Sequence, residues 1–261
     1  MRLRATGALA ACALLAGAGI ALAQPPDGVV GPTREPPSAS AKLGHEIFEA
    51  NCASCHGGLG QGIYRPRPGA GDIAGAAPSL YNVGAEAADF YLRTGFMPLV
   101  NPHAQPTNNR VLFDEKEIRS LVAFVASLGH GPAIPHPEPA RASLAEGLKV
   151  FTENCAGCHQ IVARGGFVTG ARVPPLQGVD ATEIAEAVRI GPYLMPRFSR
   201  RQIDDSQLNA LVRYVLSTRT PDNRGGWSIG NLGPIPEGMI AWLAALALAV
   251  LCLGLGRRLR A

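Results

Sequence analysis

The chain has 261 residues, of which 47% are hydrophobic and only 6% aromatic, and its formal net charge at pH 7 is +4. The 31 glycines and 22 prolines indicate many turns, and domains of about a hundred residues with so few large apolar side chains would be short of core material unless they held a bulky apolar group. The basic residues are scattered and form no recognition motif, so nucleic-acid binding is disfavoured.

Residues 1–23 have the features of a targeting segment. Arg2 and Arg4 form a basic start, an apolar stretch follows, and an Ala-x-Ala cleavage pattern ends at Ala23. We therefore expect residues 1–23 to be a signal peptide that exports the rest of the chain, with an uncleaved anchor as the alternative. Residues 24–40 are rich in proline and should form an extended leader.

Residues 41–129 form the first of two similar units. The stretch "AKLGHEIFEA" predicts an amphipathic helix, which leads into the run Cys-Ala-Ser-Cys-His at 52–56. A loop-rich stretch follows and contains a Met-Pro pair at 97–98. The apolar spacing over 115–128 predicts a second amphipathic helix that closes the unit.

The same order of features recurs over residues 142–218, after a proline-rich linker at 130–141. A helical pattern leads into the run Cys-Ala-Gly-Cys-His at 155–159, a Met-Pro pair follows at 195–196, and the helical pattern of 205–217 closes the unit. Neither unit shows β alternation of useful length. Both are therefore expected to be small all-α domains with long loops.

The C-terminal part predicts a membrane anchor. After a connector at 219–237, residues 238–256 form a stretch of 19 residues without a charge. As a helix this stretch would be roughly 28 Å long, close to the ~30 Å hydrocarbon thickness of a bilayer. Three arginines follow in the basic tail at 257–261, which predicts a cytoplasmic C-terminus and places residues 24–237 on the outer side of the cell membrane.

The repeated Cys-x-x-Cys-His run admits three chemistries. A zinc site needs four ligands, usually from two such cysteine pairs, yet each unit holds only one pair. A redox-active Cys-x-x-Cys favours a thioredoxin-like βαβ setting, which the sequence does not show. Covalent c-type haem attachment remains, because this spacing lets both sulfurs form thioethers on one edge of the porphyrin while the histidine lies under the iron. We therefore expect two covalently bound haem c groups, attached through Cys52, Cys55, Cys155 and Cys158, with His56 and His159 as iron ligands.

The sixth ligand of each iron is expected to be a methionine. Met97 and Met195 lie 41 and 36 residues after the motif histidines, and each precedes a proline. Their matched positions in both repeats outweigh the ordinary use of methionine as an adaptable core residue. His/Met ligation leaves no open position for oxygen or substrate, so such a centre transfers electrons and binds no small-molecule substrate. His103, close after Met97, is the rival ligand, whereas surface roles are expected for His45, His130 and His136.

Each unit resembles a class I cytochrome c domain, with its first helix, haem motif, axial methionine and closing helix. Two such domains between a leader and a C-terminal span resemble the dihaem cytochrome c subunit of the actinobacterial cytochrome bc complex. The stretch "NLGPIPEGMIAWLAALA", which enters the predicted span, is similar to that family's membrane entry. The fold class implied is all-α, with two tandem class I cytochrome c domains plus one C-terminal transmembrane helix.

The resemblance implies an electron-transfer subunit of a quinol–cytochrome c reductase in an aerobic respiratory chain. Its partners would be a cytochrome b subunit, a Rieske iron–sulfur subunit that donates electrons, and an aa-type cytochrome c oxidase that accepts them. The quinol chemistry would belong to the partners, and this chain would be an electron carrier. The alternatives are a dihaem electron acceptor of a periplasmic dehydrogenase and a dihaem peroxidase, which needs an iron that can open a coordination position.

Overall fold

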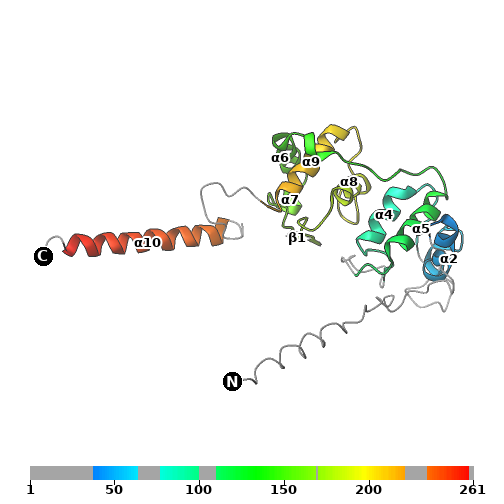
Figure 1. Cartoon of the computed structure of the whole chain (residues 1–261), viewed down its shortest axis with the longest axis horizontal. Helices are drawn as coiled ribbons and strands as arrows, with labels where there is room; N and C mark the ends of the chain where they lie inside the picture. The colour runs from blue at the N-terminus through cyan, green and yellow to red at the C-terminus, as the bar shows by residue number, and fades with distance from the viewer. Residues whose placement is uncertain (1–37, 64–76, 100–109, 169, 221–233, 259–261) are drawn as a thin grey trace, which may run out of the picture. The chain divides into compact units, whose positions relative to one another are not determined.

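The structure is a computed structural model of the chain and describes residues 38–63, 77–99, 110–168, 170–220 and 234–258. By its contacts the chain divides into two compact, mainly helical units, Met1–His136 with Thr182–Ser199 and Pro137–Ala181 with Arg200–Ala261 (Figure 1). The predicted signal peptide lies outside the described residues. The predicted domain boundaries, 41–129 and 142–218, stay a prediction, because residues 182–199 group with the first unit.

The first unit contains four helices between residues 38 and 136 where the structure describes them: α2 (Ala41–Asn51), α3 (Ala53–His56), α4 (Gly84–Arg93) and α5 (Glu115–Ala126). The residues before the helices explain two of the starting points. The Ser40 side chain accepts a hydrogen bond from the backbone of α2, and Asp114 and Glu117 form a capping box at the start of α5. Helices α2 and α4 both pack against α5.

The core of the first unit confirms the predicted apolar stripe of its closing helix. On α5, the buried side chains include Ile118, Leu121, Val122 and Val125. At the crossing of α2 and α5, a Cβ on Gly44 would lie 1.9 Å from the Ser120 carbonyl oxygen. Glycine is therefore required where the two helix backbones meet.

The second unit repeats this crossing. Its helices, α6 (Leu144–Asn154), α7 (Ala156–His159) and α9 (Asp205–Ser217), follow the single 3₁₀ turn η1 (Pro139–Arg141). Helix α6 packs against α9, and a Cβ on Gly147 would lie 2.0 Å from the Ala210 carbonyl oxygen. The predicted stripe of the closing helix is again buried, at Leu208, Leu211, Val212 and Val215. The two predicted first-and-last helix pairs are thus confirmed.

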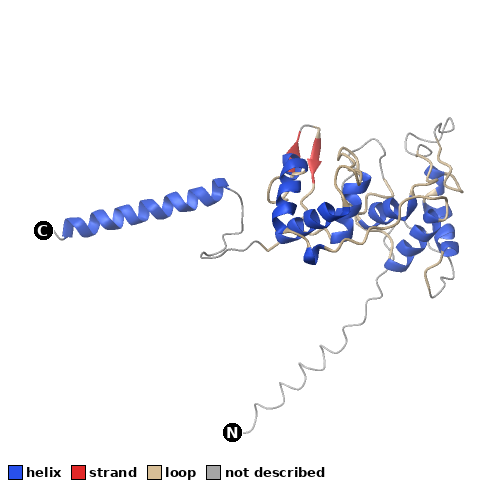
Figure 2. Ribbon diagram, turned by 90° about the horizontal axis from the view of Figure 1, so that it is seen from above, coloured by secondary structure: helices blue, strands red, loops and turns tan. Residues whose placement is uncertain are grey.

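Two helices and one β-hairpin occur where the sequence predicted loops. Helices α4 and α8 (Ala181–Ile190) each precede a Met-Pro pair, and strands β1 (Gly166–Val168) and β2 (Ala171–Val173) form an antiparallel hairpin, drawn in red in Figure 2. The helices are only ten residues long each, and the strands are too short to show alternation. The prediction of mostly helical domains is confirmed, with this small hairpin added.

Helix α10 (Pro234–Arg258) contains the predicted span. Its segment Glu237–Arg257 is long and apolar enough to cross a membrane, and none of it is buried against the rest of the described protein. A helix with exposed leucines and a tryptophan around its circumference is unfavourable in water and suited to lipid.

Candidate functional site

Each Cys-x-x-Cys-His run folds into a single helical turn at the end of a longer helix. In α3, the His56 N–H donates to the Cys52 carbonyl over 2.9 Å, and in α7 the His159 N–H donates to the Cys155 carbonyl over 2.9 Å. Residues three and four apart in a helical turn lie on one face. The turn therefore brings both cysteines and the histidine of each run together.

The asparagine that begins each run helps to end the preceding helix. The Asn51 side-chain amide donates to the Ile47 carbonyl over 2.8 Å, and the Asn154 amide donates to the Val150 carbonyl over 2.9 Å. Each bond runs from the last residue of the helix to the carbonyl four residues earlier, and so ties the asparagine side chain back to the preceding turn. The repeated asparagine thus makes the same hydrogen bond in both units.

The imidazole of His56 is held by a backbone carbonyl. Its Nδ1 lies 2.9 Å from the Pro78 carbonyl oxygen, which can only accept a hydrogen bond. Nδ1 must therefore carry the proton, and Nε2 keeps the lone pair that a metal ion needs. This tautomer suits an iron ligand.

His159 is 9% exposed, and burial lowers its pKa, whereas the nearby Pro174 carbonyl acts in the opposite direction. A lowered pKa favours the neutral ring that binds metal ions. Its buried Nδ1 has no hydrogen-bond partner of good geometry among the described residues. Pro174 corresponds to Pro78, because each lies two residues before a leucine whose N–H bonds back to the loop after the motif.

The backbone after the motif repeats its shape in both units. Three positions, one, four and six residues after the histidine, have positive φ angles: Gly57, Gly60 and Gly62 in the first unit and Gln160, Ala163 and Gly165 in the second. Glycine adopts this conformation freely, whereas Gln160 and Ala163 bear a steric cost of about 1 kcal/mol each. The loop conformation is kept even where the residues do not favour it, which indicates a functional requirement.

The first cysteine of each motif is shielded from solvent, half-buried at Cys52 and buried at Cys155. Burial, with a smaller contribution from the neighbouring Cys55, raises the pKa of Cys52 to about 12, and burial together with Cys158 raises that of Cys155 to about 11. Such thiols are protonated at neutral pH and are weak free nucleophiles. Among the described residues no cluster of metal-ligating side chains suits a bare metal ion.

The predicted axial methionines follow α4 and α8. The Met97 N–H donates to the Tyr91 carbonyl, and the Met195 N–H donates to the Pro192 carbonyl, each over 3.0 Å. Both side chains are half-buried.

The rival histidines have other surroundings where they are described. The His45 ring packs on Phe124 at 4.8 Å between centroids, and its Nε2 lies 3.4 Å from the Glu49 carboxylate. His130 and His136 are exposed in the linker. His103 lies outside the described residues.

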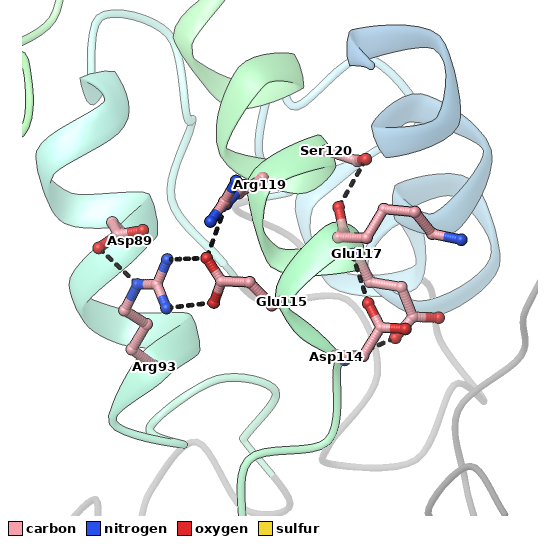
Figure 3. A network of polar contacts seen from close by, with 8 residues as sticks. Asp89, Arg93, Asp114, Glu115, Glu117, Arg119 and Ser120 are labelled. Atoms are coloured by element: carbon pink, nitrogen blue, oxygen red, sulfur yellow. Dashed lines mark hydrogen bonds and ion pairs between the residues drawn. The ribbon is translucent and has the colours of Figure 1, made fainter. Parts of the chain in front are cut away.

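A polar network joins α4 to α5 in the first unit (Figure 3). Arg93 donates from Nε to the buried Asp89 over 2.8 Å and from its two terminal nitrogens to Glu115 over 2.7 and 3.0 Å. Hydrogen bonds from Arg93 and Arg119 lower the pKa of Glu115 to about 2. The network fixes α4, which leads to Met97, on α5.

These observations fit covalently held haem. Each unit offers two thiols and an imidazole on one helical turn, and in the first unit Nδ1 of the imidazole is held by a backbone carbonyl. The cofactor would supply a one-electron iron centre, and the chain's own groups would hold it and set the ligand orientation.

Comparison with known proteins gives matches for both units. Residues 41–129 match the family model described as "Cytochrome c", and residues 142–215 match "Cytochrome C oxidase, cbb3-type, subunit III". The chain is 30% identical over 269 residues to the cytochrome bc1 complex cytochrome c subunit of Corynebacterium diphtheriae, covering 96% of this chain and 92% of the relative.

Two further relatives extend the comparison. The protein of the same description from Mycobacterium tuberculosis is 33% identical over 262 residues, covering 97% of this chain and 90% of the relative. The Cbb3-type cytochrome c oxidase subunit CcoP of an Azospirillum species is 29% identical over 191 residues, covering 66% of this chain and 60% of the relative. The likeness to the first two proteins therefore extends over nearly the whole chain.

Proposed function

Because the chain belongs to the family of cytochrome c subunits of the cytochrome bc1 complex, we propose that it is the dihaem electron-transfer subunit of a quinol–cytochrome c reductase. It would accept electrons from a Rieske iron–sulfur protein and pass them to an aa-type cytochrome c oxidase. The observation that carries the proposal is the repeated turn of two cysteines and one histidine, formed in each unit with the same backbone course.

The residues divide into two roles. The four cysteines would attach haem c through thioether bonds, and a histidine and a methionine would serve as iron ligands: Cys52, Cys55, His56 and Met97 for the first haem, and Cys155, Cys158, His159 and Met195 for the second. The protonated Nδ1 of His56 donates to the Pro78 carbonyl, which keeps the ring oriented with Nε2 toward the iron. With both axial positions filled by side chains, neither haem has a position for substrate.

The membrane topology follows from the C-terminal helix. Helix α10 anchors the chain, and the arginines at 257, 258 and 260 face the cytoplasm by the positive-inside rule. Both haem units then lie on the extracytoplasmic side, where haem c is attached and where a Rieske protein and the oxidase would dock. The signal peptide at 1–23 would be removed after export.

Purification through a tag on this chain tests the partners. After extraction in mild detergent we expect a cytochrome b subunit, a Rieske protein and the subunits of an aa-type oxidase to accompany the tagged chain. Recovery of a periplasmic dehydrogenase in their place would support the alternative function and refute the proposed one.

Substitution of the methionines tests the ligands. Met97→Ala and Met195→Ala should each remove one haem's share of the near-infrared sulfur-to-iron charge-transfer band, because that band requires an iron–sulfur bond. Carbon monoxide should bind the reduced variants but leave the spectrum of the reduced parent protein unchanged. A band that survives in either variant would show that the corresponding methionine is not a ligand.

A further inference from the structure

The segment after α8 folds back on the helix from which it comes. The chain turns at Gly191, with a φ of +66° and so little room that a Cβ would lie 2.6 Å from the Arg197 backbone nitrogen. The Phe198 N–H then donates to the Val188 carbonyl over 2.9 Å. Residues 191–198 thus form a closed loop, called the Met195 loop below, on the last turn of α8.

Arg189 closes the Met195 loop a second time. Its guanidinium donates to the Phe198 carbonyl over 3.3 Å. The two backbone polar groups of Phe198 are therefore both bound by consecutive residues of α8, the N–H by Val188 and the carbonyl by Arg189. A hydrogen bond from a charged donor is stronger than one between neutral groups, so the arginine adds substantially to this closure.

The Met195 loop presents its methionine differently from its neighbours. Tyr193 and Leu194 are 54% and 60% exposed, and Pro196 and Arg197 are also exposed, whereas the Met195 side chain is half-buried. Tyr193 also has a φ of +54°, a conformation that is strained for a bulky residue. A strained loop with exposed neighbours needs a restraint to keep the half-buried Met195 side chain in place.

The loop around Met97, which corresponds to the Met195 loop in the first sequence repeat, has a different support. Phe90, Tyr91 and Phe96 pack together around the start of that loop, with ring centroids 5.4–6.4 Å apart. Arg93, near the end of α4 as Arg189 is near the end of α8, bonds to Asp89 and Glu115. Packed aromatic rings support the residues around Met97, and Arg93 binds carboxylates on α4 and α5.

We propose that Arg189 is the positioning residue for the second haem's axial methionine: by binding the Phe198 carbonyl, it holds the Met195 loop closed and so keeps the sulfur on the iron. The inference rests on the proposed ligand role of Met195 and adds a residue that acts on this ligand through the Met195 loop. Because Met195 leaves the iron when its loop opens, loss of Arg189 makes the second haem easier for external ligands to bind.

The test uses the full chain in detergent with Met97→Ala, so that the remaining near-infrared band reports the second haem alone. Imidazole is titrated into the ferric protein until the band disappears. Arg189→Ala should lower the imidazole concentration at the midpoint by about tenfold, the effect of losing one charged hydrogen bond that opposes opening. Arg189→Lys keeps a charged donor and should restore part of the resistance.

Arg197→Ala is the matched control, because it removes an exposed charge from the Met195 loop without removing the bond to Phe198. It should titrate like the background protein, and far-UV circular dichroism should show equal helix content in all variants. Equal shifts for Arg189→Ala and Arg197→Ala, or no shift for either, would overturn the inference. If Met195→Ala leaves the band intact in this background, the ligand assignment itself fails, whatever Arg189 does.

Discussion

The crossing of α6 and α9 gives a quantitative test of the second unit. Helix α6 ends in the cysteine–histidine turn, so its seating on α9 supports the position of the second haem motif. Gly147 lies where the helices cross, and we consider its replacement by alanine. In an exposed helix that change would stabilise the protein, because alanine is the better helix former by about 1 kcal/mol.

The packing around Gly147 reverses the sign of this stability change, so that alanine destabilises the protein. A Cβ on Gly147 would lie 2.0 Å from the Ala210 carbonyl oxygen and 2.9 Å from the Tyr214 Cβ, whereas real Cβ contacts are essentially never under 3.0 Å. The helices would have to separate by about 1 Å in a close-packed interior. Overpacking costs about 1–3 kcal/mol, and the upper value applies because a backbone carbonyl cannot rotate away. After the helix-propensity gain, the variant should be about 2 kcal/mol less stable.

Guanidinium chloride unfolding of the full chain, followed by circular dichroism and haem absorption, measures this loss. With a slope of about 3 kcal/mol per molar, the midpoint of the second unit should fall by about 0.7 M. Gly178→Ala is the control, because nothing lies within 4 Å of a Cβ there and the residue is outside the helices and the cysteine–histidine run, and it should stay within about 0.5 kcal/mol of the parent. If Gly147→Ala is as stable as this control, the helices do not cross as closely as described.

Two further predictions concern the network of Figure 3 and the anchor. Glu115→Gln should destabilise the first unit by about 1 kcal/mol at pH 7, since a half-exposed pair is screened. Hydrogen bonds from Arg93 and Arg119 lower the pKa of Glu115 from 4.5 to about 2, so its contribution is complete above pH 4.5 and is lost as the pH falls toward 2. Thermal unfolding at several pH values measures the difference, and one that grows on acidification would contradict the assignment. Removal of residues 234–261 should move the haem-containing chain from the membrane fraction to the soluble fraction after alkaline washing, whereas retention in the membrane would show a second anchor.

The helical form of the two Cys-x-x-Cys-His runs was predictable from sequence, because such a turn depends on neighbouring residues, and their use as haem sites stays a prediction. The turns of α3 and α7 need no distant contact to bring their cysteines and histidine together. The closing helices were predictable for a similar reason, since apolar residues at helical spacing mark the face that must be buried. Helices α4 and α8 escaped prediction, although Ile184, Ala185 and Val188 give a short apolar face that a closer reading of the pattern would have found.

Other features depend on residues far apart in the chain. The Pro78 carbonyl that orients His56 comes from 22 residues further along. The sequence signals this carbonyl only through a Pro-x-Leu pattern that occurs in both repeats. The positive φ angles of Gln160 and Ala163 contradict their local preferences, so only the surrounding loop can impose them.

The sequence by itself determined the two haem motifs, the two helix pairs that frame them and the apolar C-terminal helix, because each follows from the spacing of residues within one or a few turns. The tertiary structure decided how these parts are held: Gly44 and Gly147 at the helix crossings, Arg93 between α4 and α5, and Arg189 on the Met195 loop. The difference has a physical cause. Spacing fixes which side chains share a face, whereas a backbone collision or a hydrogen bond to a distant carbonyl exists only after the chain has folded.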